Sequence, residues 1–265
     1  MSFTAVFEDV KIVRSLFRGV SDLLSEANLY VDEEGMRVQG LDDSRVAMLS
    51  LKMPSSAFHS FDFEPPEGAE LIQLGLNFSD IKKIFAKAKA KDSVQLALVR
   101  EDRLYFEITF FRGTIDDMTQ VRRFKVPVIE VPSETITPRE LELDVTVEFA
   151  TGSWIADLVA GAAIVADDLQ VIANKEEERL TFLAEGELGK FEYPVDLSRE
   201  EIIMRYEILK DARAIYSLDY LKKMDTPAKI ADSVIIRFSN NMPMELTYLV
   251  GGGFELKYLL APRVI

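Results

Sequence analysis

Hydrophobic positions in the first half of the chain switch between helical and alternating spacing. Over residues 10–27, apolar side chains recur every three or four positions, as on one face of an amphipathic helix. Residues 29–41 alternate between apolar and polar side chains around an expected turn at Glu34-Gly35, which predicts a β-hairpin. Further patterns predict a strand over 44–53, a helix over 78–90 with Ser79 as its N-cap, and two strands over 92–111.

The second half repeats this order of elements. The patterns predict a helix over 153–169, a hairpin over 169–187, a helix over 217–231, and strands over 232–250 and 254–264. Short identities support the match: Lys82-Lys83 and Asp92-Ser93-Val94 recur as Lys222-Lys223 and Asp232-Ser233-Val234, at an offset of 140 (222 − 82 and 232 − 92). An internal duplication is therefore expected.

A proline-spaced segment separates the two halves. Its prolines are incompatible with a regular helix or a central strand, so an extended connector is predicted; they are Pro127, Pro132 and Pro138. The expected domains are 1–126, a connector over 127–140, and 141–265. The expected fold class is α+β: two similar domains, each with two helices packed on antiparallel sheets, because no βαβ alternation indicates a parallel sheet.

Composition is typical of a globular protein that stays inside the cell. Of 265 residues, 48% are hydrophobic, which is sufficient for a sizeable core. The N-terminal residues lack the basic and apolar regions of a signal peptide, and no apolar run is long enough for a membrane helix. The chain has no cysteine, which excludes disulfides and thiolate metal sites.

Few residues are available for catalysis. His59 is the single histidine and is interpreted as a surface or structural residue, and Gly251–Phe254 lies between two predicted strands rather than before a helix. The acidic pairs are interpreted as turn and cap residues: Asp42-Asp43, Asp116-Asp117 and Asp167-Asp168. No enzymatic activity, cofactor or metal is therefore predicted. The alternative is an enzyme whose catalytic groups the sequence does not reveal.

Basic residues gather on predicted helices of an otherwise acidic chain, whose formal charge is −14. One such face alone is more often only a solvated surface. Repeated basic helices instead suggest a surface that meets phosphate, and no base-reading motif accompanies them, so binding would be independent of sequence. The predicted DNA-binding residues are Lys11, Arg14, Arg18, Lys82, Lys83, Lys87, Lys222 and Lys223, with Lys89, Lys91 and Lys229 nearby. Lys83, Lys87 and Lys91 are expected to stack on one helix face.

Three segments carry a family resemblance. They are 26–53, 184–193 ("AEGELGKFEY") and 240–265, which ends in "LLAPRVI". The chain resembles the archaeal and eukaryotic DNA sliding clamps, the proliferating cell nuclear antigen family, and is most similar to the archaeal branch. The resemblance implies a trimeric ring around duplex DNA that acts as a processivity factor in replication and repair. It also implies a cytoplasmic location on the nucleoid in an archaeon, or a nuclear one in a eukaryote.

The resemblance also implies partners. DNA polymerase, the clamp loader, flap endonuclease and DNA ligase would bind through a short hydrophobic-aromatic peptide. Matching positions for this peptide are Gln39, Leu41, Arg45, Val46, Met48, Ile136, Pro138, Pro243, Leu259, Ala261 and Pro262. Subunits would join at strand edges, which are expected at 103–111 and 178–186.

Two departures from the family pattern leave alternatives open. The predicted helix at 153–169 has no Lys or Arg and carries Asp157, and Thr135 and Thr137 make the connector less apolar. A homotrimer and a subunit of a heterotrimer are both compatible with these features. The alternative function is a checkpoint-type clamp subunit of a heteromeric ring that signals DNA damage.

Overall fold

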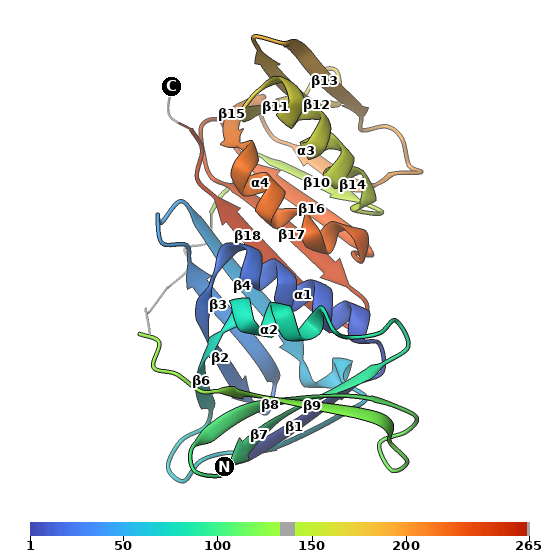
Figure 1. Ribbon diagram of the computed structural model, residues 1–265. Helices are drawn as coiled ribbons and strands as arrows, with labels where there is room; N and C mark the ends of the chain where they lie inside the picture. The colour runs from blue at the N-terminus through green and yellow to red at the C-terminus, as the bar shows by residue number, and fades with distance from the viewer. Residues whose placement is uncertain (133–140, 264–265) are drawn as a thin grey trace. The chain divides into compact units, whose positions relative to one another are not determined.

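The computed structural model describes residues 1–132 and 141–263, which form two compact units (Figure 1). Unit 1 comprises Met1–Gly40, Ser50–Ile136 and Gly251–Glu255, and unit 2 comprises Leu41–Leu49, Thr137–Val250 and Leu256–Ile265. Within the described ranges, all strand pairs with a given register are antiparallel.

Unit 1 contains two sheets. The first has the order β5-β1-β7-β8-β9 and the second includes the run β6-β2-β3-β4. The strands are β1 (Ser2–Phe7), β2 (Glu26–Asp32), β3 (Gly35–Leu41), β4 (Ala47–Pro54), β5 (Ser60–Glu64), β6 (Ile72–Asn77), β7 (Ser93–Arg100), β8 (Leu104–Arg112) and β9 (Thr119–Pro127), with a short 3-10 helix at Ser55–Ala57. The β2–β3 turn lies at Glu33-Glu34, one residue earlier than predicted, and Gly35 adopts a φ of 134° beyond it.

Unit 1 also contains two helices, α1 (Val10–Leu23) and α2 (Phe78–Phe85). Along the chain, α1 connects β1 to β2 and α2 connects β6 to β7. The apolar face of α1 is buried at Val13, Leu16 and Phe17, as the helical spacing predicts. The Phe17 ring meets the rings of Phe78 and Phe85 edge-on at centroid distances of 5.7 and 5.5 Å. These contacts pack the two helices together and leave their polar faces exposed.

Unit 2 repeats this plan. It has a sheet with the order β13-β12-β11-β15, a run β14-β10-β16-β17-β18, and the helices α3 (Ser153–Val165) and α4 (Leu218–Met224). The strands are β10 (Val145–Phe149), β11 (Asp168–Asn174), β12 (Arg179–Gly186), β13 (Gly189–Asp196), β14 (Ile203–Ile208), β15 (Ala212–Ser217), β16 (Ser233–Phe238), β17 (Met244–Val250) and β18 (Phe254–Leu260), with a 3-10 helix at Thr226–Lys229. Trp154 is half-buried and stacks on Tyr193 with ring centroids 5.9 Å apart.

The duplication predicted from the sequence is confirmed by the element order. Helix α2 begins at Phe78 and α4 at Leu218, and the strands that follow them begin at Ser93 and Ser233. Both pairs keep the offset of 140 that the lysine and Asp-Ser-Val identities display (218 − 78 and 233 − 93). Residues 251–253 form a turn between β17 and β18, as expected, and Phe254 begins β18.

Several local predictions are wrong, among them the helix over 217–231, because α4 ends at Met224. Helix α2 is capped by Asn77, whose side chain accepts from the Asp80 backbone N–H at 2.9 Å, rather than by Ser79. The strand expected over 44–53 begins only at Ala47, because Asp42 holds the preceding residues in a loop. Strands β8 and β12, which were expected at sheet edges, are paired on both sides, and their outer neighbours β9 and β13 are edge strands instead.

No helix among the described residues is both long and apolar enough to cross a membrane.

Candidate functional site

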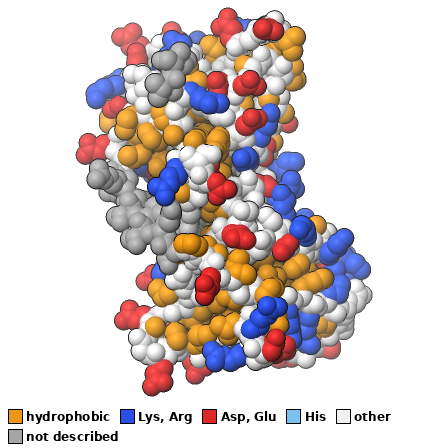
Figure 2. Space-filling view, turned by 60° about the vertical axis from the view of Figure 1, so that its left-hand side comes forward, with side chains coloured by type: hydrophobic (Ala, Val, Ile, Leu, Met, Phe, Trp, Pro, Cys, Tyr) orange, Lys and Arg blue, Asp and Glu red, His pale blue; other side chains and the backbone are white. Residues whose placement is uncertain are grey.

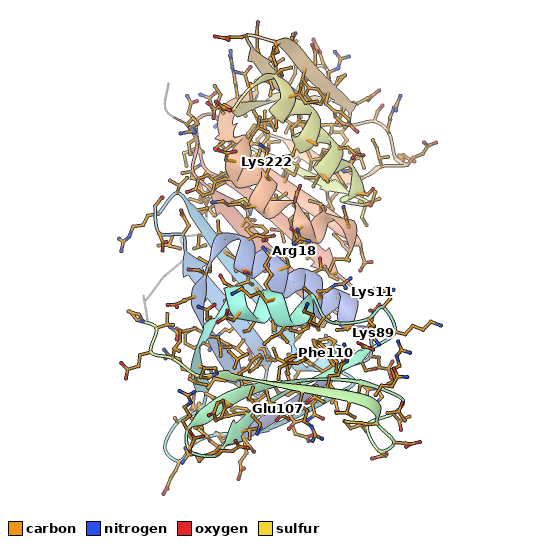
Figure 3. The ribbon with its side chains drawn as sticks, in the orientation of Figure 1. Lys11, Arg18, Lys89, Glu107, Phe110 and Lys222 are labelled. Atoms are coloured by element: carbon orange, nitrogen blue, oxygen red, sulfur yellow. The ribbon has the colours of Figure 1, made fainter. Side chains whose placement is uncertain are left out.

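The basic face of α1 carries three of the predicted DNA contacts. Asp9 caps this helix by accepting from the Lys11 backbone N–H at 2.9 Å. The Lys11 side chain is exposed. Arg14 is half-buried and Arg18 is exposed. Figure 3 displays Lys11 and Arg18 along the same helix.

Acidic side chains neutralise part of this charge. Asp22, near the end of α1, accepts from Lys82 of α2 and lies 3.5 Å from the Arg18 guanidinium. Lys83 pairs with Asp80 at 2.8 Å. The Lys83–Asp80 pair is exposed on both sides and contributes about 0–1 kcal/mol, so an incoming phosphate can displace it at little cost.

The lysines that follow α2 lie on a turn, not on a helix face as predicted. The helix ends at Phe85, and Lys87, Lys89 and Lys91 are all exposed beyond it. The turn is ordered by Asp92, which is only 2% exposed and accepts from the Lys89 backbone N–H at 2.7 Å.

Two arginines complete the coordination of Asp92. Arg122 of β9 donates to the Asp92 carboxylate and, at 2.6 Å, to the Lys87 carbonyl oxygen, and its guanidinium covers the Phe110 ring. Arg112 of β8 lies 3.4 Å from the same carboxylate. Because Asp92 is buried among donors, it fixes the turn that presents the exposed lysines. Figure 3 labels one of these lysines, Lys89.

Helix α4 presents the second basic pair. Lys222 is exposed and lies 3.5 Å from the Asp219 carboxylate, and the Lys223 ammonium lies 4.9 Å from the centre of the Tyr220 ring. Helix α3 has no basic residue, and its exposed positions include Asp157, Ala160 and Ile164. Figure 2 displays Lys and Arg side chains intermixed with acidic ones on the visible face.

A compact loop from Asp42 to Ala47 carries several of the predicted peptide contacts. The Asp42 carboxylate accepts from the backbone N–H groups of Ser44, Val46 and Ala47, at 3.1, 2.8 and 2.7 Å. Its fourth donor is the Tyr220 hydroxyl, at 2.6 Å. Arg45 within the loop is exposed and adopts a φ of 57°, a left-handed conformation that these bonds sustain.

The pKa values of Asp42 and Tyr220 are shifted in opposite directions. Burial opposes the charge of Asp42, but the hydrogen bonds from Tyr220 and the loop N–H groups outweigh it, so the pKa of Asp42 lies below its ordinary value. Burial, and then the hydrogen bond to Asp42, raise the pKa of Tyr220. At neutral pH the pair is therefore a carboxylate that accepts from a neutral phenol.

The predicted peptide-binding residues that lie in unit 2 include a half-buried apolar set. Ala261 donates its N–H to the Val46 carbonyl oxygen at 2.9 Å, which joins the segment after β18 to the loop. Met48 is buried at 7% exposure and is a core residue. The half-buried members are Leu41, Val46, Pro243, Leu259, Ala261 and Pro262. Gln39 is half-buried on β3 in unit 1, and Ile136 and Pro138 lie outside the described residues.

The start of the predicted connector is bound to unit 1. Asn28, which is 5% exposed, donates to the Val131 carbonyl oxygen at 3.1 Å, and Ile129 donates its N–H to Gly75 at 2.9 Å. A Cβ at Gly75 would lie 2.2 Å from the Ile129 carbonyl oxygen, so only glycine permits this approach. The sequence did not predict the roles of Asn28 and Gly75, because each contacts residues that are distant in the chain.

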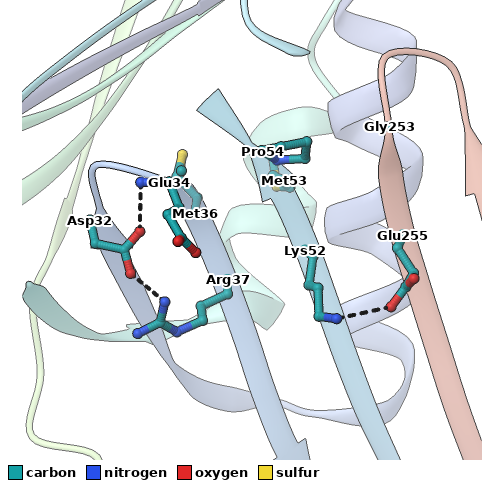
Figure 4. Close-up of a pocket in the computed structure, with 10 residues that line it drawn as sticks. Asp32, Glu34, Met36, Arg37, Lys52, Met53, Pro54, Gly253 and Glu255 are labelled. Atoms are coloured by element: carbon teal, nitrogen blue, oxygen red, sulfur yellow. Dashed lines mark hydrogen bonds and ion pairs between the residues drawn. The ribbon is translucent and has the colours of Figure 1, made fainter. Parts of the chain in front are cut away.

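The remaining surface features of unit 1 are not arranged for catalysis. A pocket of about 380 Å³ is lined by two ion pairs, Arg37–Asp32 and Lys52–Glu255, beside Met36 (Figure 4). His59 lies 3.0 Å from Glu8 at the surface. Over residues 1–132 and 141–263, no group of three His, Cys, Asp or Glu side chains has the geometry of a metal site.

Comparison with known families matches both halves of the chain. Residues 2–135 match the N-terminal domain of proliferating cell nuclear antigen, and residues 139–263 match its C-terminal domain.

Individual relatives match over the same span. Proteins named DNA polymerase sliding clamp from Thermococcus gammatolerans and Pyrococcus furiosus are 32% and 33% identical over 264 residues, covering 100% of this chain and 99% of each relative. A crystal structure of proliferating cellular nuclear antigen from Entamoeba histolytica superposes with a TM-score of 0.84, at 18% identity and 99% coverage of both chains.

A duplicated fold of this kind, matched over nearly the whole chain, defines a DNA sliding clamp, which is a non-catalytic scaffold rather than an enzyme. The chain belongs to the proliferating cell nuclear antigen family, and archaeal sliding clamps are among its relatives.

Proposed function

We propose that this protein encircles duplex DNA as a ring, without sequence specificity, and tethers DNA polymerase and other enzymes of replication and repair. The observation that carries the proposal is the repeated placement of exposed lysines, Lys83 on α2 and Lys223 on α4, at one offset within a clamp fold. Lysines on helix faces contact phosphates but read no bases. The remaining predicted contacts are Lys11, Arg14, Arg18, Lys82, Lys87 and Lys222.

Ring closure is proposed to use the edge strands β9 and β13, each of which lies at one edge of its sheet. Strand β9 carries Arg122, Arg123 and Lys125, whereas β13 carries Glu192 and Asp196 beside a single Lys190, and the turn before it adds Glu187. Since one chain has both a basic and an acidic edge, identical subunits can join head to tail. An unpaired edge would otherwise promote aggregation, so pairing with a neighbour satisfies the backbone groups of both strands.

Client enzymes are proposed to bind the half-buried apolar set around Val46 and Ala261 through a short hydrophobic-aromatic peptide. The clamp loader, flap endonuclease and DNA ligase are proposed clients beside polymerase. The domain boundaries proposed for this chain are 1–126, 127–140 and 141–265. The relatives are named for DNA polymerase, which favours a polymerase clamp over a checkpoint-type subunit.

The test of the proposal is retention on circular DNA. Clamp assembled on a nicked plasmid by a clamp loader is expected to stay bound through gel filtration and to be released when the plasmid is linearised. Release from linear DNA only would establish topological binding. Equal retention on both forms, with a steep salt dependence, would indicate ordinary electrostatic binding and would contradict the ring.

A further inference from the structure

Tyr220 joins a helix with predicted DNA contacts to the loop with predicted client contacts, and both belong to unit 2. Its side chain leaves α4, its hydroxyl donates to Asp42 at 2.6 Å, and its ring lies 4.9 Å from the Lys223 ammonium. Tyr220 and Asp42 are 178 positions apart in the sequence, so only the fold brings them together.

The hydroxyl completes the set of donors around Asp42. Three loop N–H groups also point at this carboxylate, which is 8% exposed. A buried carboxylate that loses one of four donors must find water or rotate, and rotation would break bonds to the loop. The orientation of the Asp42–Ala47 loop therefore depends on the Tyr220 hydroxyl.

The loop in turn determines where two apolar contacts lie. The Val46 N–H is bound to Asp42 and the Val46 carbonyl oxygen to the Ala261 N–H, so both sides of Val46 are held by hydrogen bonds. Ala261 precedes Pro262 in the same predicted site. A shift of the loop would consequently displace Val46 relative to Ala261 and Pro262.

We infer that Tyr220 is a positioning residue for client binding: through Asp42 it holds the 42–47 loop in the conformation that offers Val46 to the peptide. The inference rests on the proposed function for the identity of the bound peptide, but not for the loop geometry. The Lys223 ammonium lies over the Tyr220 ring, whereas the Tyr220 hydroxyl donates to Asp42. The positioning therefore acts through the hydroxyl and not through the cation.

The experiment uses the full-length clamp with Tyr220→Phe, which removes one oxygen and keeps the ring. Backbone amide resonances of Ser44, Val46 and Ala47 are followed by NMR. Binding of a fluorescein-labelled synthetic peptide, with two adjacent aromatic residues after an aliphatic one, is followed by anisotropy. The expected results are shifts of these three resonances and an affinity loss of about five-fold, the effect of one hydrogen bond.

Tyr248→Phe serves as the matched control. It removes a fully buried hydroxyl that has no hydrogen-bond partner among the described residues. It is expected to leave the three resonances and the peptide affinity unchanged. An equal response to Tyr248→Phe would indicate general destabilisation and would overturn the inference.

The two readouts separate failure of this inference from failure of the proposed function. Unchanged loop resonances in Tyr220→Phe would overturn the positioning role, whether or not the peptide binds. Shifted resonances with unchanged affinity would overturn its importance for clients. If the unaltered clamp does not bind the peptide, the proposed client site is wrong, and so is the role of Tyr220 in client binding. The loop resonances still test whether Tyr220 positions the 42–47 loop.

Discussion

Arg122 on the edge strand β9 donates to the buried carboxylate of Asp92 at the end of the lysine-bearing turn. The same guanidinium donates to the Lys87 carbonyl oxygen, so a single arginine holds the turn at two points. The strand proposed to join subunits and the turn proposed to approach DNA are therefore tied together within unit 1.

Removing the Asp92 charge is expected to destabilise the protein strongly. In Asp92→Asn the carboxylate charge is lost and one of its two acceptor oxygens becomes an NH2 donor facing other donors, and breaking a buried ion pair costs about 3–5 kcal/mol. Urea unfolding measures this loss. The control is Glu101→Gln, which breaks the exposed pair with Lys125 and is expected to change stability little. Equal effects of the two variants would contradict a special role for Asp92.

Charge reversal of the exposed lysines is expected to weaken retention on DNA without loss of fold. Lys83→Glu combined with Lys87→Glu and Lys223→Glu should shorten the lifetime on nicked circular DNA and reduce the salt dependence of binding, because each phosphate contact contributes about one unit to the salt slope. Lys52→Glu makes the same charge change at an exposed β4 position and serves as the control. Retention that survives the triple change would remove these lysines from the DNA surface.

Reversing charge on one edge strand is expected to weaken subunit association. Arg123→Glu should lower the mass measured by light scattering from about three times the 30.0 kDa of the chain towards the monomer. Combining it with Glu192→Lys should restore part of the association, because opposite charges would again face each other across the joint. Full association of Arg123→Glu alone would argue against β9 as the joining edge.

Truncation of the apolar set is expected to weaken peptide binding. Val46→Ala and Pro262→Ala each remove contact area at half-buried positions and should lower the affinity about five- to ten-fold, measured by anisotropy. Met204→Ala removes an apolar side chain that is 61% exposed on β14 and should leave the affinity unchanged. An unchanged affinity in both site variants would place the peptide elsewhere.

The contribution of Asp42 to stability is expected to depend on pH. Because its pKa in the folded protein lies below the ordinary value of 3.8, its stabilising contribution is present above that value and is lost as the pH falls through the folded-state pKa. The stability difference between the unaltered protein and Asp42→Asn should therefore be constant near neutral pH and shrink below about pH 4. Urea unfolding over a pH series measures it. A difference independent of pH down to pH 2 would contradict the depressed pKa.

Local sequence patterns predicted the element types because they depend on neighbours in the chain. The three- and four-residue spacing in α1 and the alternation in β2 and β3 both place apolar side chains on one face, and a buried face decides the element. The offset of 140 between the lysine pairs likewise revealed the duplication without any structure. The family resemblance then indicated the clamp fold, which the comparisons confirmed.

Long-range contacts decided what the sequence could not. Lys87 lies on a turn because Asp92 and Arg122, which are 30 positions apart, meet there, and β8 is internal because β9 pairs along it. The sequence predicted a turn role for Asp42, but it could not predict the hydrogen bond that Asp42 accepts from Tyr220. The sequence alone determined the periodicity, the repeat and the family. The tertiary structure decided which strands are edges and which polar side chains are buried, because both depend on partners distant in the chain.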